Sequence, residues 1–391
     1  FDQNSFTYTY LIASDKGREA LIIDPVLEKT DQYIKLLNEL ELKLVKVIDT
    51  HIHADHISGL AELRNRTKCI TLMGEHAPAD VVSMKVKDNE NIHIENIQLT
   101  SIYTPGHTDD SYSFLMNDRV FTGDTLLIKG TGRTDFQNGN PYDQYHSLFD
   151  RLLKLPNNTF IYPAHDYKGE NVSTIGEEIN FNPRLQVTSV QEYVKIMENL
   201  NLDNPKLMDV AVPANQSMGM TNETQKMLNG ISYDKLINLV KNDQSILIDL
   251  REDIEIDKKP SLDNSINITY SSLQNYLNEN KDLLKSKTLI FYCAVGERSA
   301  LAIQICQAYN KHRTTVRTAD HDENRAILLL HPFHAMSLPS PQGQQIVRDC
   351  DLPSSLTLWN HDRGRFHHAL DARRVQLRHV RRDLHVHHVQ C

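Results

Sequence analysis

The stretch Thr50-His51-Ile52-His53-Ala54-Asp55-His56 places four potential metal ligands within six residues. The apolar run 44–48 just before it predicts a strand, so the ligands follow a strand end, where one tight turn can aim several side chains at one point. Imidazole nitrogen and carboxylate oxygen suit borderline metals such as zinc and iron. A polar surface loop is the alternative, but so dense a group of ligands favours a metal site.

Three later residues add to this set of ligand types: His107 in Thr-Pro-Gly-His-Thr, Asp124 in Phe-Thr-Gly-Asp, and His165 in Tyr-Pro-Ala-His-Asp. Asp124 and His165 each stand at the end of an apolar run that predicts a strand, 120–124 and 160–163. Taken singly, each residue is more often an ordinary loop residue than a ligand. Together with the histidine loop they predict one metal centre at the edge of a sheet.

The rest of the chain predicts α/β organisation. A hairpin of strands 7–13 and 20–24 precedes a helix at 30–41, whose apolar residues form one stripe. The segment 205–229, rich in Asn, Met and Gly, predicts an extended linker. A second, small α/β domain follows, and its expected elements are a helix from 236 to 240 and buried strands at 245–249 and 288–292.

Composition excludes several classes of protein. A formal net charge of -9 over 391 residues argues against a nucleic-acid partner, because such domains usually carry a basic excess. No stretch approaches the roughly 18 apolar residues that span a bilayer, so no membrane partner is expected. The start of the chain lacks the features of an export signal, which predicts a cytoplasmic protein, or a mitochondrial matrix protein if a targeting segment precedes Phe1. Whether the protein forms a homo-oligomer is left open by the sequence.

The cysteines are five in number and have no CxxC spacing, which fits neither a disulfide framework nor a cysteine zinc site. A reducing compartment is therefore expected.

The composition changes abruptly after residue 310. The chain has 21 Lys and 9 Arg up to that point and 1 Lys and 11 Arg beyond it, and 11 of its 19 histidines lie in 311–391. Such a switch, with little periodicity, predicts an atypical Arg- and His-rich tail that is disordered or frame-shifted. The alternative is a metal-binding tail that uses His385, His387 and His388.

The motifs HxHxDH, PGHT, FTGD and PAH, in this order, resemble the metallo-β-lactamase superfamily over roughly residues 1–220. The resemblance implies an αββα sandwich. Within the superfamily, four stretches look like the persulfide dioxygenases, the ethylmalonic-encephalopathy-protein family. These stretches are 126–137, with Gly-Arg-Thr-Asp-Phe-Gln, 162–167, 182–185 and 210–215.

This resemblance implies one Fe(II) per chain, bound by His51, His107 and Asp124 as a two-histidine, one-carboxylate set. The remaining ligand-type residues would orient these ligands or hold a second metal: His53, Asp55, His56 and His165. The implied reaction is the oxidation of glutathione persulfide, or a related small persulfide, by O2 to sulfite and glutathione.

Three residues are candidates for substrate binding. Arg133 lies in a glycine-containing loop after Asp124, and its planar guanidinium suits a glutathione carboxylate. The alternative is that Arg133 pairs with Asp135 and stiffens the loop. Tyr167 and Arg184 are candidates for the same pocket.

The alternative function is that of a binuclear zinc thioester hydrolase of the glyoxalase II type. In that family the histidine loop usually continues with Gly-Asn, whereas here it continues Ile57-Ser58-Gly59-Leu60. This departure and the Gly-Arg-Thr-Asp-Phe-Gln stretch favour the dioxygenase.

The second domain is predicted over 228–310 and resembles the rhodanese domain. Two stretches carry the resemblance: Leu247-Ile-Asp-Leu-Arg-Glu and Phe291-Tyr-Cys293-Ala-Val-Gly-Glu-Arg298-Ser. A cysteine in a turn that opens a helix is surrounded by N–H groups that favour a thiolate or persulfide, and Arg298 adds positive charge. Cys293 and Arg298 are therefore its candidate catalytic residues. The usual Gly-His-Ile-Pro-Gly-Ala motif and the last strand are missing, which predicts a truncated domain. The alternatives are a buried, inert cysteine and a docking module without activity.

Overall fold

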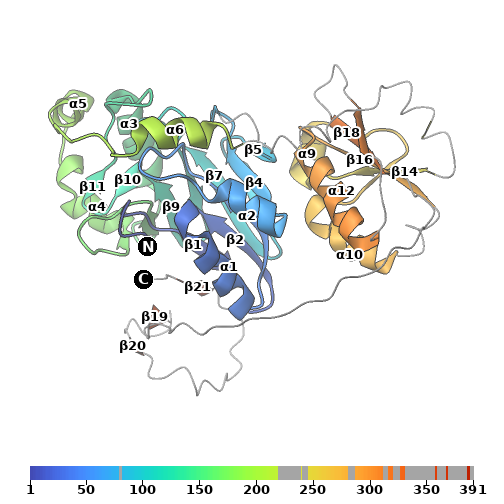
Figure 1. Ribbon diagram of the computed structural model, residues 1–391. Helices are drawn as coiled ribbons and strands as arrows, with labels where there is room; N and C mark the ends of the chain where they lie inside the picture. The colour runs from blue at the N-terminus through green and yellow to red at the C-terminus, as the bar shows by residue number, and fades with distance from the viewer. Residues whose placement is uncertain are drawn as a thin grey trace. The chain divides into compact units, whose positions relative to one another are not determined.

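The computed structural model describes residues 1–78, 82–218, 239, 245–280 and 287–310, and five short segments beyond them, 316–319, 326–330, 357–358, 367–368 and 385–387. The chain divides into two compact units, residues 1–219 with 355–391, and residues 220–354 (Figure 1). No helix of the described residues is long and apolar enough to cross a membrane.

The first unit is a sandwich of two six-stranded sheets (Figure 1). The first sheet has the order β21-β1-β2-β3-β4-β5, with parallel pairing from β2 to β5 and antiparallel pairing on either side of β1. Its strands are β1 (Tyr10–Ala13), β2 (Glu19–Ile23), β3 (Lys43–Ile48), β4 (Ile70–Gly74), β5 (Met84–Val86) and β21 (His385–His387). β4 is buried along its whole length, as a strand covered on both faces must be.

The second sheet has the order β13-β12-β9-β8-β7-β6 and is mostly antiparallel, with one parallel pair, β9 and β12. Its strands are β6 (Asn91–Ile94), β7 (Ile97–Tyr103), β8 (Tyr112–Leu115), β9 (Arg119–Gly123), β12 (Phe160–Pro163) and β13 (Ser173–Thr174). A small hairpin, β10 (Leu126–Leu127) and β11 (Gly130–Thr131), follows β9. Three of the four motifs that supply histidine and aspartate follow the ends of β3, β9 and β12, and the fourth, with His107, lies in the loop between β7 and β8.

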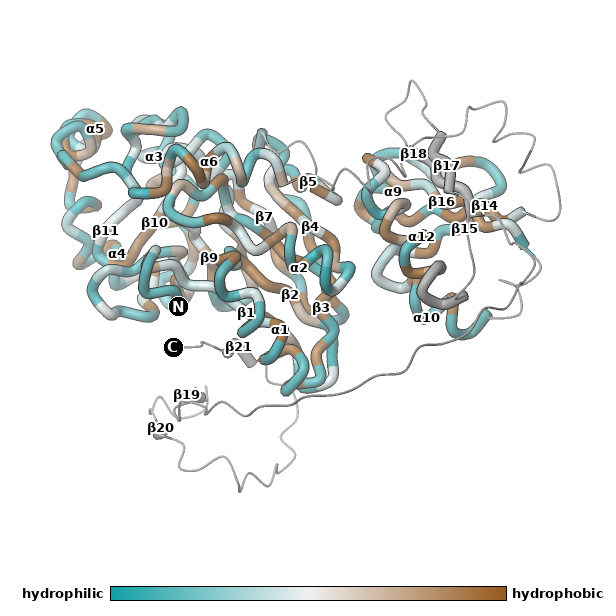
Figure 2. Tube along the Cα trace, viewed as in Figure 1, coloured by the Kyte–Doolittle hydropathy of each residue, from teal (hydrophilic) through white to brown (hydrophobic). Residues whose placement is uncertain are grey.

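Helices cover the sheets and complete two hydrophobic cores. Leu37 and Leu63 from the helices α1 (Thr30–Glu39) and α2 (Leu60–Thr67) belong to one core, and Tyr193 and Ile175 from α5 (Val190–Glu198) and α4 (Ile175–Phe181) belong to the other. α3 (Pro141–His146) packs against α5. Hydrophobic residues colour the strands of both sheets (Figure 2), which agrees with the expected sandwich.

The second unit has a five-stranded sheet of order β15-β14-β16-β18-β17. β14 (Ser245–Asp249) pairs in parallel with β15 (Ser265–Asn267) and with β16 (Thr288–Cys293). The helices are α9 (Asp253–Lys258), α10 (Leu273–Glu279) and α12 (Glu297–Asn310), and α12 packs on β16. The predicted strands at 245–249 and 288–292 are confirmed, whereas the helix predicted at 236–240 lies, except for Leu239, outside the described residues.

Two expectations need correction. Part of the predicted linker 205–229 is a helix, α6 (Met208–Gln216), because burial of Ala211 and Asn215 on one face outweighs the poor helix propensity of Pro213. Strand structure also continues beyond residue 310, where β17 (Val316–Ala319) and β18 (Ala326–Leu330) join the second sheet. The apolar run Ala326–Leu330 is typical of a strand.

The remaining described residues of the tail form β19 (Thr357–Leu358) and β20 (His367–His368), which pair with each other, and β21, which pairs with β1. Most of residues 311–391, His388 among them, lies outside the described residues. The interpretation of this tail as frame-shifted stays a prediction.

Candidate metal centre and cysteine loop

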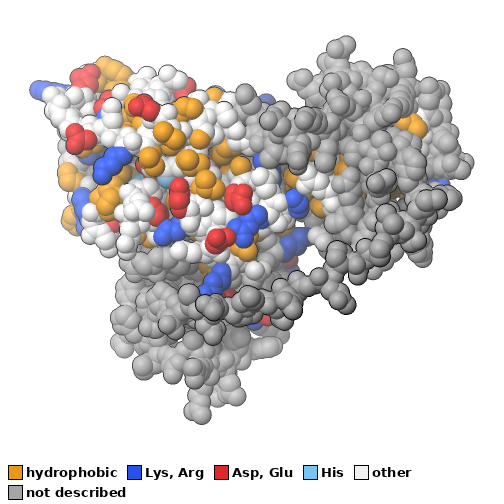
Figure 3. Space-filling view, viewed as in Figure 1, with side chains coloured by type: hydrophobic (Ala, Val, Ile, Leu, Met, Phe, Trp, Pro, Cys, Tyr) orange, Lys and Arg blue, Asp and Glu red, His pale blue; other side chains and the backbone are white. Residues whose placement is uncertain are grey.

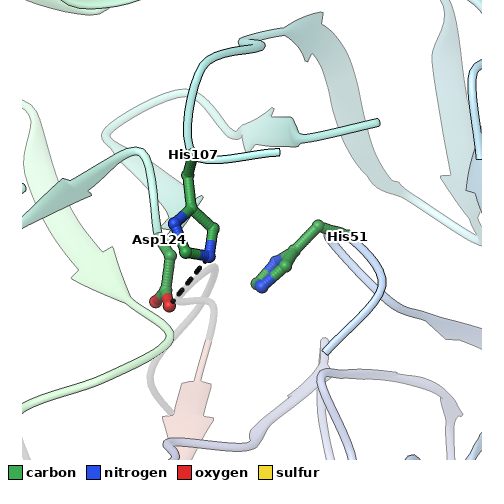
Figure 4. A group of neighbouring side chains, drawn as sticks. All are labelled: His51, His107 and Asp124. Atoms are coloured by element: carbon green, nitrogen blue, oxygen red, sulfur yellow. Dashed lines mark ion pairs between the residues drawn. The ribbon is translucent and has the colours of Figure 1, made fainter. Parts of the chain in front are cut away.

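Three side chains, two from strand ends and one from a loop, meet at one point of the first unit (Figure 4). His51 follows β3, Asp124 follows β9, and His107 lies in the loop between β7 and β8. One ligand atom from each lies within 4.8 Å of the other two, and Nε2 of His107 lies 3.6 Å from Oδ2 of Asp124. Two donors of one ion, each about 2.0–2.2 Å from it, would show such a separation.

Each of the two histidines has one ring nitrogen engaged by the protein. Nδ1 of His107 lies 2.7 Å from the carbonyl oxygen of Arg133, to which only a protonated nitrogen can donate. Nδ1 of His51 lies 2.9 Å from the hydroxyl of Thr50, which in turn donates to Asp24. These contacts leave the two Nε2 atoms for a metal, as is usual for histidine ligands, and burial lowers the pKa of His51, which favours its neutral, ligating form. The donor set therefore fits a metal ion.

Gly132 allows the loop after Asp124 to come this close. A Cβ atom there would lie 2.1 Å from the carbonyl oxygen of Asp124 and 2.8 Å from Nδ1 of His107, where no side chain fits. A glycine is therefore needed for close approach rather than for an unusual backbone angle.

His165 lies between two carboxylates. Its Nδ1 is 2.6 Å from Asp124 and its Nε2 is 2.9 Å from Asp55. Burial opposes protonation of this ring, but the two carboxylates raise its pKa well above the usual value. Both nitrogens are thus engaged, and His165 orients Asp124 through a charged hydrogen bond.

The other half of the histidine loop forms a second group of ligand types. His53, Asp55 and His56 offer ligand atoms within 4.8 Å of one another, and His53 Nδ1 and His56 Nε2 have no hydrogen-bond partner among the described residues. Nε2 of His53, however, lies 3.1 Å from Asp24. Burial lowers the pKa of His53, but Asp24 outweighs it and raises that pKa to about 9.

Residues remote in sequence fix the loop, and the sequence analysis missed them. The backbone N–H groups of Thr50 and Ile52 donate to Asp24 and Asp110, at 2.7 and 2.9 Å. Thr7 bonds to Asp55 at 3.1 Å, and Asn215 bonds to the backbone of the loop. No local pattern marks such residues, because each acts through a contact that only the fold creates.

A pocket of about 900 Å³ opens above this centre. His51, His107, Asp124 and His165 line it, and so do all three candidate substrate residues, Arg133, Tyr167 and Arg184. Its wall also carries Phe6, Leu202, Leu207, Lys168 and Lys206. One face of the first unit gathers hydrophobic side chains with charged ones around them (Figure 3).

Arg133 is engaged within its own surroundings. Its guanidinium forms a two-pronged contact with Asp135 at 2.6 Å and donates to the carbonyl oxygens of Asp203 and Leu202 at 2.6 and 3.1 Å. This is the pairing that the sequence analysis gave as the alternative to substrate binding. Arg133 here braces the pocket wall at 202–204.

The other two candidates differ in how exposed they are. The Tyr167 ring stacks on the ring of His165, with centroids 6.0 Å apart and planes at 4°, and 64% of its surface is exposed. Arg184 is only partly exposed, and its guanidinium donates to the carbonyl oxygen of Thr131. Tyr167 is therefore better placed to meet a ligand.

In the second unit, Cys293 ends β16 and the helix α12 begins at Glu297. The sulfur of Cys293 accepts a hydrogen bond from the Gly296 N–H at 3.1 Å. Such a donor is expected in a loop that favours negative charge on sulfur. Arg298 is buried and pairs with both oxygens of Glu255 at 2.6 Å, so its charge is partly balanced. Cys293 itself has no exposed surface, and neither does Arg298.

Comparisons with known proteins agree with this architecture. Residues 3–79 and 73–165 match the metallo-beta-lactamase superfamily, and residues 232–320 match the rhodanese-like domain. The chain is 44% identical over 223 residues to "Persulfide dioxygenase ETHE1, mitochondrial" of Mus musculus, which covers 56% of this chain and 87% of the mouse protein. It is 32% identical over 237 residues to a probable hydroxyacylglutathione hydrolase of Schizosaccharomyces pombe, covering 52% and 90%.

Among solved structures, ETHE1 from Myxococcus xanthus is similar to this chain, with 48% identity and a TM-score of 0.55. The match covers 56% of this chain and 97% of that protein. The similarity to these relatives thus rests on the first unit, while the second unit has its own, separate match.

Proposed function

Because this chain belongs to the metallo-beta-lactamase superfamily and, within it, to the family of the persulfide dioxygenases, we propose that its first unit oxidises a small persulfide such as glutathione persulfide. In the overall reaction, one persulfide, one O2 and one water give one thiol, one sulfite and two protons. The outer sulfur is oxidised and O2 is reduced. The observation that carries the proposal is the set of His51, His107 and Asp124 at the floor of the pocket.

The proposed metal is one Fe(II) per chain, held by these three residues. Two imidazoles and one carboxylate on one side leave positions open for substrate and O2, and iron supplies redox chemistry that zinc, with its filled d shell, lacks. His165 supports this assignment, because its two nitrogens are engaged by Asp124 and Asp55 and leave none for a second ion.

The pocket walls support a small anionic thiol as the carrier of the persulfide. Lys168, Lys206 and Arg184 bring positive charge, and Phe6 and Leu207 bring apolar surface. Acidic residues line the pocket as well: Asp2, Glu28, Asp55, Asp124, Asp166 and Asp203. Glutathione carries carboxylates that such cations attract. We propose that Tyr167, exposed beside His165, contacts the bound substrate.

A second candidate is the binuclear zinc thioester hydrolase. The free nitrogens of His53 and His56, close to Asp55, favour it, because a second ion would need further ligands of this kind. His165 argues against it, because its hydrogen bonds to Asp124 and Asp55 would have to be broken before it could bind a second ion.

The test of the first unit is metal analysis and O2 uptake with glutathione persulfide, on protein purified without oxygen. We expect iron, persulfide-dependent O2 consumption and sulfite. Zinc alone, together with hydrolysis of lactoylglutathione and no O2 uptake, would contradict the proposal and favour the second candidate.

Single substitutions to alanine separate the ligands from their neighbours. Loss of His51, His107 or Asp124 should abolish iron binding, whereas loss of His53 or His56 should leave a measurable part of it, because second-layer partners typically change metal affinity about 10–100-fold. His93, exposed on β6, provides the control His93→Ala, which should keep full iron content. Equal loss from the ligands and from His53 or His56 would count against the assignment.

For the second unit we propose sulfur transfer through a persulfide on Cys293. The Gly296 N–H at the sulfur and the match to the rhodanese-like domain support it. A thiosulfate:glutathione sulfurtransferase assay of Cys293→Ser tests the proposal. Activity equal to that of the parent would remove Cys293 from the reaction, and a parent without any activity would favour a docking module.

For the compartment we propose the cytoplasm, with the mitochondrial matrix as the alternative. The name of the mouse relative contains the word mitochondrial, which supports the alternative. Fractionation of the source cells with an antibody to this chain tests the two.

A further inference from the structure

The histidine loop is held in two halves by side chains from separate parts of the chain. Its first half, around Thr50 and Ile52, is fixed by the carboxylates of Asp24 and Asp110. The side chain of Asn215, on α6, reaches the backbone of the second half, residues 53–58.

Asn215 makes three hydrogen bonds to the loop. Its Nδ2 donates to the carbonyl oxygens of His53 and His56, at 3.0 and 2.9 Å, and its Oδ1 accepts from the N–H of Ser58 at 2.9 Å. The direction of the amide is fixed by its partners, because a carbonyl can only accept and a backbone N–H can only donate. The side chain thus ties together backbone groups that span six residues.

These three hydrogen bonds are buried, so their loss would cost more free energy than the loss of exposed ones. Asn215 is 1% exposed, and Ala211, one turn earlier on α6, is fully buried on the same face. Without the amide, two carbonyls and one N–H of the loop would lose these partners in a place that solvent reaches poorly. A buried polar group without a partner is costly, so the loop would have to shift to find others.

The residues that Asn215 holds connect to the metal centre. Asp55 lies within the tied segment and contacts His165 at 2.9 Å, and His165 contacts Asp124 at 2.6 Å. A displacement of the segment would therefore be passed to a carboxylate that is a proposed ligand. Asn215 itself lies outside the residues that line the pocket.

We propose that Asn215 is a positioning residue of the metal centre, which sets the ligand geometry by clamping the second half of the histidine loop. This inference rests on the proposed function only in taking His51, His107 and Asp124 to hold a metal. The rival explanation is that Asn215 merely docks α6 on the sheet and contributes stability alone.

The variant Asn215→Asp separates the two. It keeps the shape of the side chain and an acceptor for Ser58, but it replaces the donor by oxygen that faces two carbonyls. The full chain, stripped of metal, is titrated with Co(II) and followed by visible absorption, which reports both the affinity and the ligand geometry. We expect an affinity about 10–100-fold weaker than that of the parent and a changed Co(II) band.

Two matched controls accompany it. Gln216→Glu makes the same amide-to-carboxylate change at the neighbouring, exposed position and should leave the affinity within about twofold. Ala211→Gly destabilises the same helix without touching the three hydrogen bonds, so it should lower the unfolding temperature of the first unit but keep the Co(II) spectrum. If Asn215→Asp does not fold, Asn215→Ala is titrated in the same way.

An affinity and spectrum of Asn215→Asp equal to those of the parent would overturn the proposal. So would an equal loss in Ala211→Gly, because stability alone would then explain the effect. A parent that binds Co(II) but never oxidises persulfide would refute the proposed function and leave this comparison valid.

Discussion

Replacing Glu255 with glutamine removes the partner of a buried cation in the second unit. Both terminal nitrogens of Arg298 lie 2.6 Å from the two oxygens of Glu255, and the side chain of Arg298 has no exposure. The side chain of Glu255 is only 13% exposed, so solvent screens the pair weakly. The amide of the variant would still accept one hydrogen bond, but Arg298 would lose the carboxylate with which it pairs.

The size of the effect follows from this geometry. At 2.6 Å and an effective dielectric constant of about 20, the attraction of two unit charges is roughly 6 kcal/mol. Desolvation offsets part of it, and removing one partner of a buried pair costs about 3–5 kcal/mol. A whole domain is stable by only about 5–15 kcal/mol. With about 4–8 °C per kcal/mol for a small domain, the unfolding temperature should fall by at least roughly 12 °C.

Calorimetry of the full chain measures this change. The transition of the second unit should move, while that of the first unit provides an internal reference. Glu279→Gln, the same exchange at an exposed position of α10, should leave both transitions in place. The double variant Glu255→Leu with Arg298→Met, which removes both charges, should recover most of the loss. A shift of less than about 2 °C for Glu255→Gln, or no recovery in the double variant, would refute the reasoning.

Three further results are expected. Gly132→Ala should lower metal content several-fold, as measured by metal analysis, because the new methyl group would lie 2.1 Å from the carbonyl oxygen of Asp124 and 2.8 Å from His107. Asp249→Asn should destabilise the second unit at pH 7, and progressively less as the pH falls below 3.8. Burial raises the pKa of Asp249, but hydrogen bonds from Arg251 and Ser261 outweigh it and hold this pKa below 3.8, so the stabilising effect is complete above that value and is lost as the pH falls through the lowered pKa. Melts at a series of pH values from about 7 downward check this. Removal of metal with a chelator should lower the unfolding temperature of the first unit alone, and Fe(II) should restore it.

The sequence alone predicted the features that depend on short segments of the chain. Each of the four motifs follows a strand or lies in a loop, and the structure brings the candidate ligands His51, His107 and Asp124 together. The hairpin, the first helix and the strands that precede the ligands are confirmed with small shifts at their ends. Periodicity and strand-end polarity are properties of short segments, so one sequence can reveal them.

The sequence was insufficient where a residue acts through a distant contact. The segment around Asn215 looked like a linker because it is rich in Asn, Met and Gly, whereas in the folded chain Val212 packs against the first core and Asn215 bonds to the histidine loop. For Arg133 the sequence left two roles open, and the choice depends on carbonyl oxygens at 202 and 203, about 70 residues away. Backbone acceptors carry no signature in the sequence, so such contacts stay hidden until the chain folds.

The division of roles within the histidine loop follows from which neighbours engage each side chain. His51 is held on one nitrogen by Thr50 and has the other free toward His107 and Asp124. Asp55, by contrast, is engaged by His165, and that contact keeps His165 charged between two carboxylates. A second metal beside Asp55 would need His165 to give up a proton and one of these bonds. The contacts of His165 with Asp124 and Asp55 occupy both of its ring nitrogens, which supports the single ion that we propose.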